Sequence, residues 1–254
     1  MNSIVAYIPE GKQVDMNQSA DLTAILNNLP PEQQQALFQQ LRQRFTIHPL
    51  EQQWNISAEF ILEAISQSQD ITKRGVRGII AELCFNTYIL GAMQQRGWTH
   101  HPQVGDLPYD ALISHPNVGH IKIQTKNQRL ERGVPKYANT PMIRFNPAVD
   151  GWFVCETQKT RTGKDNEGQD TRPYRYGEFD ILSVCLHPSS GDWTQFMFCP
   201  AHTLIPRADN PALIAVLQPV APTRQANWTN NLEEAIQWHL ERKQFNPGNI
   251  GSLI

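Results

Sequence analysis

Four side chains in the middle of the chain are of the types that metal-dependent cleavage of a phosphodiester needs. Glu82 and Asp110 are carboxylates, Gln124 offers an amide oxygen, and Lys126 offers an ammonium. Mg²⁺ accepts carboxylate and amide oxygens, and a bound Mg²⁺ neutralises charge on the phosphate and acidifies an attacking water. A nearby lysine can position or deprotonate that water, or stabilise the charge on phosphorus. We therefore predict all four as catalytic residues and the first three as metal ligands.

The spacing of three of these residues predicts that a hairpin brings them together. Two alternating runs, residues 109–114 and 120–126, flank a turn. If the hairpin folds symmetrically about that turn, Asp110 pairs with Gln124. Directly opposed residues share a sheet face with Cβ atoms about 5 Å apart, and Lys126 returns to that face two residues later. Ile121 and Ile123 on the second strand then point to the opposite, buried face.

Glu82 is predicted to lie on a buried helix over residues 77–95, where it is the only charged residue after Arg77. The glutamate interrupts the apolar run, and a membrane-spanning helix needs about 20 mostly apolar residues. A carboxylate on a buried helix is costly unless it is paired or binds a metal. Two readings are open: an ion pair with Arg74 or Arg77, or the second carboxylate of a metal site. The hairpin favours the metal site.

The order of these residues resembles that of the PD-(D/E)xK nuclease superfamily, which includes most type II restriction endonucleases. The family pattern is a helix glutamate, a Pro-Asp motif that opens a strand, and an acid-x-Lys motif on the next strand. The motif resemblance covers residues 74–126, and the later stretch TRPYRYGEFDILSVCLHPSSGDW is similar to segments of restriction-type nucleases. The counterparts here are Glu82 in RGIIAEL, Asp110 in Pro108-Tyr109-Asp110, and Gln124-Thr125-Lys126.

The resemblance implies an α/β (α+β) fold with a restriction-endonuclease-like core, in which helices flank a mixed central sheet. It implies Mg²⁺ as the cofactor and double-stranded DNA as the substrate. A homodimer is also implied, because two cuts in a duplex need two sites. The leading hypothesis is a type II restriction endonuclease. The alternatives are a repair, recombination or homing nuclease of the same superfamily, and a DNA-binding protein on a nuclease scaffold that no longer cuts.

Two positions depart from the family pattern. One residue separates Pro108 from Asp110, and Gln124 stands where the pattern has an acid. The Gln-x-Lys form resembles a minority variant, in which the helix glutamate makes up the lost charge. An amide oxygen can ligate a metal or hold a water, but it contributes no negative charge. We therefore expect Glu82 to matter more here than in the usual pattern.

A second acid-x-Lys-like stretch, Glu156-Thr157-Gln158-Lys159, is a rival for the motif. Lys159 is adjacent to Gln158 and so falls on the opposite strand face from Glu156, which favours a DNA contact instead. Residues 172–176 mix cations with tyrosines, a combination suited to phosphate contacts and base stacking. The alternative for this cluster is a loop whose tyrosines pack against the core. The predicted DNA contacts are Arg129, Lys159, Arg161, Arg172, Tyr174 and Arg175.

The first part of the chain is predicted to be helical. Pro31 suits a first helical turn, and apolar residues follow it at helical spacing. A second helix is predicted over residues 56–66. We interpret residues 1–70 as an N-terminal helical arm or subdomain and residues 71–254 as the nuclease core.

The remainder of the core is predicted to hold further strands and a closing helix. Asn230 and Glu233 have the spacing of a capping box at the start of that helix. Helix, strands and closing helix together favour an α/β or α+β sandwich. Besides the hairpin, short apolar runs predict strands over residues 151–157, 179–187 and 195–200.

Charge and cysteine content bear on partner and compartment. Residues 122–175 hold 11 basic and 6 acidic residues, whereas the rest of the chain holds 11 basic and 18 acidic ones. A basic middle in an acidic chain indicates a surface for an anionic partner, and a solvated loop region is the alternative. The four cysteines show no CxxC spacing, and the N-terminus has no secretory-signal pattern. We expect a cytoplasmic protein without structural zinc.

Overall fold

The structure is a computed structural model that describes residues 16–103, 105, 107–159, 171–225 and 227–241. The chain divides into two compact units, Met1–Gln69 and Asp70–Ile254. Each unit is described by itself below.

The first unit is helical. Pro31 occupies the first turn of its second helix, as the sequence predicts. His48 caps the third helix, where its ring accepts from the backbone N–H of Leu50 and forms a capping box with Glu51. The first and third helices were not predicted from the sequence. The four helices are α1 (Met16–Asn28), α2 (Pro31–Arg44), α3 (Pro49–Trp54) and α4 (Ala58–Gln67).

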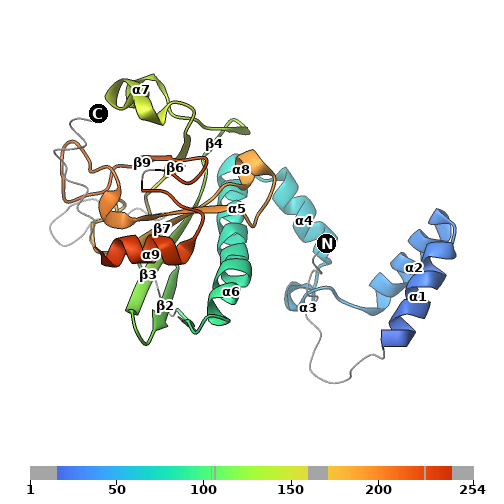
Figure 1. Ribbon diagram of the computed structural model, residues 1–254. Coiled ribbons are helices and arrows are strands. Elements are labelled where there is room, and N and C mark those ends of the chain that lie inside the picture. Colours follow the sequence, from blue (N-terminus) through green and yellow to red (C-terminus); the bar gives the residue numbers. More distant parts are fainter. Residues whose placement is uncertain (1–15, 104, 106, 160–170, 226, 242–254) are drawn as a thin grey trace. The chain divides into compact units, whose positions relative to one another are not determined.

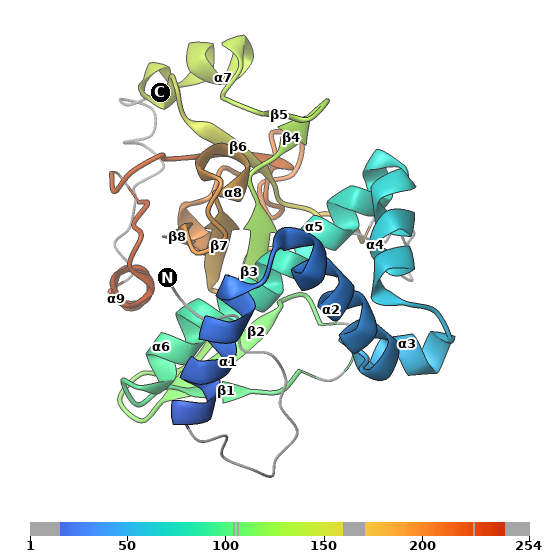
Figure 2. The same cartoon turned by 90° about the vertical axis from the view of Figure 1, so that its right-hand side faces the viewer.

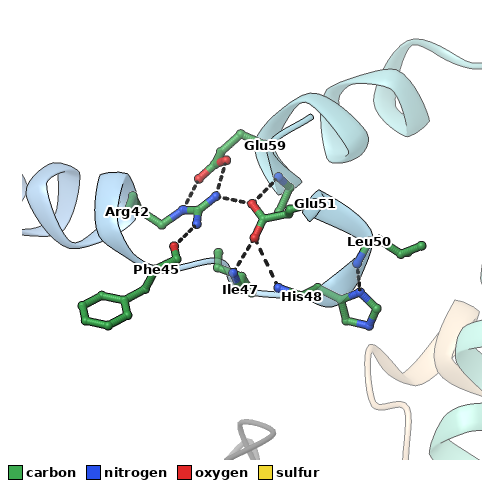
Figure 3. A network of polar contacts seen from close by, with 8 residues as sticks. Arg42, Phe45, Ile47, His48, Leu50, Glu51 and Glu59 are labelled. Carbon is green, nitrogen blue, oxygen red and sulfur yellow. Dashed lines mark hydrogen bonds and ion pairs between the residues drawn. The ribbon is translucent and has the colours of Figure 1, made fainter. Parts of the chain in front are cut away.

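The guanidinium of Arg42 joins three of these helices (Figure 3). From α2 it donates to Glu51 of α3 at 2.5 Å and to Glu59 of α4 at 2.8 Å. The Glu51 carboxylate also accepts from the backbone N–H of Ala58 at 2.8 Å. The Ala58 N–H and then Arg42 lower the pKa of Glu51 to about 2, and Arg42 lowers the pKa of Glu59 to about 2. Both carboxylates are therefore ionised at neutral pH and hold α2, α3 and α4 together.

The second unit is built on a five-stranded sheet in the order β1-β2-β3-β7-β8. β3 and β7 are parallel and the other neighbours are antiparallel, so the sheet is mixed. The hairpin of β2 and β3 has the predicted register, with Ala111 opposite Ile123. The mixed α/β fold class with N-terminal helices is thereby confirmed. The strands are β1 (Thr99–His101), β2 (Ala111–His115), β3 (Gly119–Asn127), β7 (Ile181–Cys185) and β8 (Phe196–Pro200).

One face of the sheet is covered by a long helix and by the closing helix. α5 (Asp70–Cys84) continues through the π-helical segment η1 (Phe85–Leu90) into α6 (Gly91–Gln94), so this helix starts earlier than predicted. α5 runs along β3 (Figure 1, Figure 2). By length and composition this continuous helix could cross a membrane. Its buried face instead packs on the sheet, through Ala81, Phe85, Leu90 and Met93 against Ile113, Ile121 and Ile123.

The closing helix α9 (Leu232–Leu240) packs on the same face of the sheet. Its cap differs from the prediction by one residue. The side chain of Asn231, rather than that of Asn230, accepts from the backbone N–H groups of Glu233 and Glu234. With Asn231 as the N-cap, the helix begins one residue later than the capping-box spacing indicates.

The other face of the sheet packs against a second core, which includes Leu182 and Val184 of β7. The antiparallel pair β6 (Phe153–Glu156) and β9 (Leu217–Val220) contributes to it. A bridge between Gln128 and Cys155 sets β6 beside the end of β3. The remaining elements are β4 (Leu130–Glu131), β5 (Val134–Pro135), α7 (Thr140–Phe145), η2 (Pro147–Val149), α8 (His187–Ser190) and η3 (Ala201–Thr203).

Candidate active site

Asp110 and Gln124 meet as the hairpin register predicts. The side-chain amide of Gln124 donates to the carboxylate of Asp110. The same carboxylate oxygen accepts from the backbone N–H of Thr125 at 2.8 Å. The backbone N–H of Asp110 donates to the carbonyl oxygen of Ile123 at 2.9 Å, which continues the ladder by one residue. The carboxylate is therefore held in place by backbone and side chain together.

The end of β3 extends past the end of its neighbour β2. β2 begins at Ala111, opposite Ile123, so residues 124–127 of β3 run beyond it. On its other side this part of β3 remains paired with β7. The side chain of Asn127 donates to the backbone carbonyl of Arg77 at 2.7 Å, which ties α5 to this part of β3. Residues 124–127 of β3 therefore lie beyond the end of β2 and close to α5.

Lys126 lies on the same strand face as Gln124. Its ammonium nitrogen is 5.3 Å from the ring centroid of Tyr174, a distance at which the ring face attracts a cation. Burial lowers the pKa of Lys126, and the negative charges of Asp110 and then Glu82 act against that lowering. The ammonium is therefore poorly solvated, and the charges of both acids act on it.

Glu82 lies on α5, and the charges of Asp110 and Lys126 both act on it. Burial, and then the negative charge of Asp110, raise its pKa to about 7, while Lys126 acts in the opposite direction. Among the described residues no ion pair joins Glu82 to Arg74 or Arg77. The ion-pair alternative is therefore absent from this structure.

The donor set fits a hard divalent cation. Burial and then the negative charge of Asp110 raise the pKa of the Glu82 carboxyl, and a cation held by both carboxylates would offset that repulsion. Burial also raises the pKa of Asp110. The NH₂ group of Gln124 is used on Asp110, which leaves the amide oxygen as its acceptor. Within the described ranges no three His, Cys, Asp or Glu side chains form a metal-binding group.

Glu156 and Lys159 of the second acid-x-Lys-like stretch both contact other side chains. The carboxylate of Glu156 accepts from the guanidinium of Arg129 and from the side-chain amide of Gln158. Lys159 forms an ion pair with Glu178 at 2.7 Å. Arg129 and Lys159, which were both predicted to contact DNA, are therefore each paired with a glutamate.

In the cluster of cations and tyrosines at residues 172–176, some side chains are buried in the core and others lie at the surface. Tyr174 is only 3% exposed and packs edge-on against Phe179, so its ring has no free face for a nucleobase. This is the packing alternative left open by the sequence. The side chain of Arg172 donates to the backbone carbonyl of Lys159 at 3.2 Å, and Arg175 is exposed. Arg161 lies outside the described residues.

Two features of the site were not found from the sequence. Tyr174 lies beneath Lys126 instead of contacting a base, and Glu178 pairs with Lys159. Both come from a segment that returns to the site through a bridge between Gln158 and Pro173. Nothing in the local spacing of residues 172–178 signals that pairing.

Comparisons with known proteins add a weak similarity to a solved structure. No protein-family model matches the chain, and no curated protein matches its sequence. Among solved structures, the chain is similar to a bacterial homing endonuclease, I-Ssp6803I, with a TM-score of 0.36 and 16% sequence identity. The alignment covers 69% of this chain and 97% of that chain. A likeness at this level does not bear on function, so the interpretation of the site rests on the contacts described above.

Proposed function

We propose that the protein is a Mg²⁺-dependent endonuclease that hydrolyses phosphodiester bonds in double-stranded DNA, as a type II restriction endonuclease does. The observation that carries the proposal is the meeting of Glu82, Asp110 and Lys126. Their charges act on one another, and Gln124 is hydrogen-bonded to Asp110. Groups with such perturbed pKa values gather at catalytic sites more often than elsewhere.

Each residue has a distinct role in the proposed site. Glu82, Asp110 and the amide oxygen of Gln124 would hold Mg²⁺, which neutralises phosphate charge and acidifies water when bound. Asp110 is oriented by the Thr125 N–H and by the Gln124 amide. Lys126 is desolvated above Tyr174, and its ammonium would donate to the phosphate oxygen on which charge develops.

The proposal extends to the assembly and the compartment. The mixed sheet, with these residues at the end of its hairpin, supports the restriction-endonuclease-like core that the motif resemblance implies. A homodimer would supply the second site needed to cut both strands. All four cysteines are free, which supports a reducing, cytoplasmic setting. Exposed Arg175 and the paired Arg129, Lys159 and Arg172 would contact the DNA backbone.

Digestion of a known genome-sized DNA in Mg²⁺, followed by sequencing of the ends, tests the proposed function. We expect a defined set of fragments whose ends all share one short sequence, and no product when EDTA replaces Mg²⁺. Ends without a common sequence, or a preference for branched DNA, would indicate a nuclease with another role. A gel shift without any Mg²⁺-dependent product would indicate a DNA-binding protein that does not cut.

A further inference from the structure

A second lysine shares the buried tyrosine of the active site. The ammonium nitrogen of Lys159 lies 5.3 Å from the Tyr174 ring centroid, the same distance as that of Lys126. The two nitrogens are therefore no more than twice this distance apart. They come from different elements, since Lys126 is on β3 and Lys159 follows β6. The fold thus brings two cations to one aromatic side chain.

The contacts of Lys159 hold it in this position. Its ammonium donates to one carboxylate oxygen of Glu178 at 2.7 Å, and the other carboxylate oxygen accepts from the backbone N–H of Arg175 at 2.8 Å. The backbone N–H of Lys159 donates to the carbonyl of Arg172 at 2.9 Å. An ammonium has three donors, so the bond to Glu178 leaves others for a ligand. Lys159 is therefore held in place, and its ammonium can still donate to a ligand.

The arrangement is poorly explained as a stabilising ion pair. Lys159 and Glu178 are both partly exposed, with side chains 28% and 23% accessible, and exposed pairs of this kind contribute little to stability. The Tyr174 ring attracts both ammoniums through its quadrupole but carries no charge that would neutralise them. Two lysines beside one neutral ring, one of them under the influence of Asp110 and Glu82, suit an anion with closely spaced charges.

We propose that Lys159 binds the DNA phosphate next to the one attacked beside Lys126, on the same strand. This inference rests on the proposed function and adds a phosphate-binding position to the active site. Phosphates of one strand advance about 3.4 Å along the duplex axis per nucleotide. Two ammoniums separated by no more than twice 5.3 Å therefore reach the same phosphate or close neighbours. Glu178 is the positioning residue for Lys159.

The salt dependence of DNA binding tests this position. Binding of a fluorescent duplex of random sequence is measured in EDTA between 50 and 200 mM salt, because a backbone contact is independent of sequence. Each phosphate contact contributes about 0.9 to the slope of log affinity against log salt. We expect Lys159→Gln to reduce the slope by about 0.9 and to weaken binding about tenfold at the lowest salt. Lys159→Arg, which keeps the charge, is expected to keep the slope.

Two further variants separate phosphate binding from structure. Arg96→Gln removes the same charge from an ion pair with Glu233 at 2.7 Å, in the helical layer on the other face of the sheet, and should leave the slope unchanged. Glu178→Gln removes a negative charge but keeps a side-chain oxygen that accepts from Lys159, so Lys159 stays in position and binding should strengthen a few-fold. A purely structural pair would instead give lower unfolding midpoints for both Lys159→Gln and Glu178→Gln with an unchanged slope, which would overturn the inference.

DNA binding by the wild-type protein distinguishes failure of the phosphate position from failure of the proposed function. If the wild type binds duplex DNA but Lys159→Gln keeps its full salt slope, the phosphate position is wrong and the proposed function stands. If the wild type binds no duplex DNA at any salt concentration, the proposed function fails and the phosphate position fails with it.

Discussion

Lys126→Ala is expected to abolish cleavage of duplex DNA in Mg²⁺ while leaving DNA binding largely intact. The ammonium of Lys126 is the only cation whose charge acts on both Glu82 and Asp110 within the described part of the chain. Its removal takes away the donor that would stabilise charge on the phosphate. Losses of single groups with this role slow catalysis by about 10²–10⁴-fold. Plasmid cleavage under single-turnover conditions, together with a gel shift in EDTA, measures both effects.

Asp110→Ala should give the same loss, because it removes one of the two acids and the partner of Gln124. Lys122→Ala is the matched control. Lys122 is on the same face of β3, but its ammonium donates to the backbone carbonyl of Gly177 at 2.6 Å and it has no role in the proposed chemistry. Cleavage at the wild-type rate by either Lys126→Ala or Asp110→Ala would show that the site has been assigned to the wrong residues.

Glu82→Gln is expected to abolish cleavage and, at the same time, to stabilise the fold at alkaline pH. Burial and Asp110 raise the pKa of Glu82 to about 7, from 4.5 in an unfolded chain. A raised pKa means that the folded state favours the protonated acid, so stability is full below pH 4.5 and is lost as the pH rises through 7. Each unit of pKa corresponds to about 1.4 kcal/mol, which partial exposure of the side chain reduces. We expect a gain of about 1–2 kcal/mol for Glu82→Gln at pH 8 and none at pH 4.

Urea unfolding of wild type and variant across this pH range measures the effect. Glu63→Gln serves as the control, because Glu63 is exposed on α4 and its carboxylate accepts from the side-chain amide of Gln67. A stability difference for Glu82→Gln that does not change with pH would contradict the electrostatic account of this residue. A stabilised protein that still cuts DNA at the wild-type rate would remove Glu82 from the site.

The part of the site that lies within one hairpin could be predicted from the sequence. A tight turn fixes the register, and the two-residue period of a strand then decides which side chains share a face. This is why the contact between Asp110 and Gln124 and the burial of Ile121 and Ile123 follow from spacing alone. That Glu82 lies near the hairpin could be inferred from the cost of burying an unpaired acid. The direction in which its side chain points could not be inferred.

The features that were not predicted depend on contacts between distant segments. β1 and β9 are short and carry no distinctive pattern, and their pairing is set by neighbours far along the chain. Tyr174 combines a polar group with an apolar ring, so composition alone left stacking and packing equally open. The structure buries it because the bridge between Gln158 and Pro173 brings its segment back onto the core. The long helix starts at Asp70, but residues 70–72, 74 and 75 are exposed, so packing against the sheet does not account for its early start.

A crystal structure of the protein with Mn²⁺ in place of Mg²⁺ tests the central claim most directly, because the anomalous scattering of manganese locates the ion. We expect one strong peak bound by carboxylate oxygens of Glu82 and Asp110 and by the side-chain oxygen of Gln124, with the Lys126 ammonium nearby. A peak bound by other residues, or a Glu82 side chain that points away from Asp110 in the presence of the ion, would contradict the account.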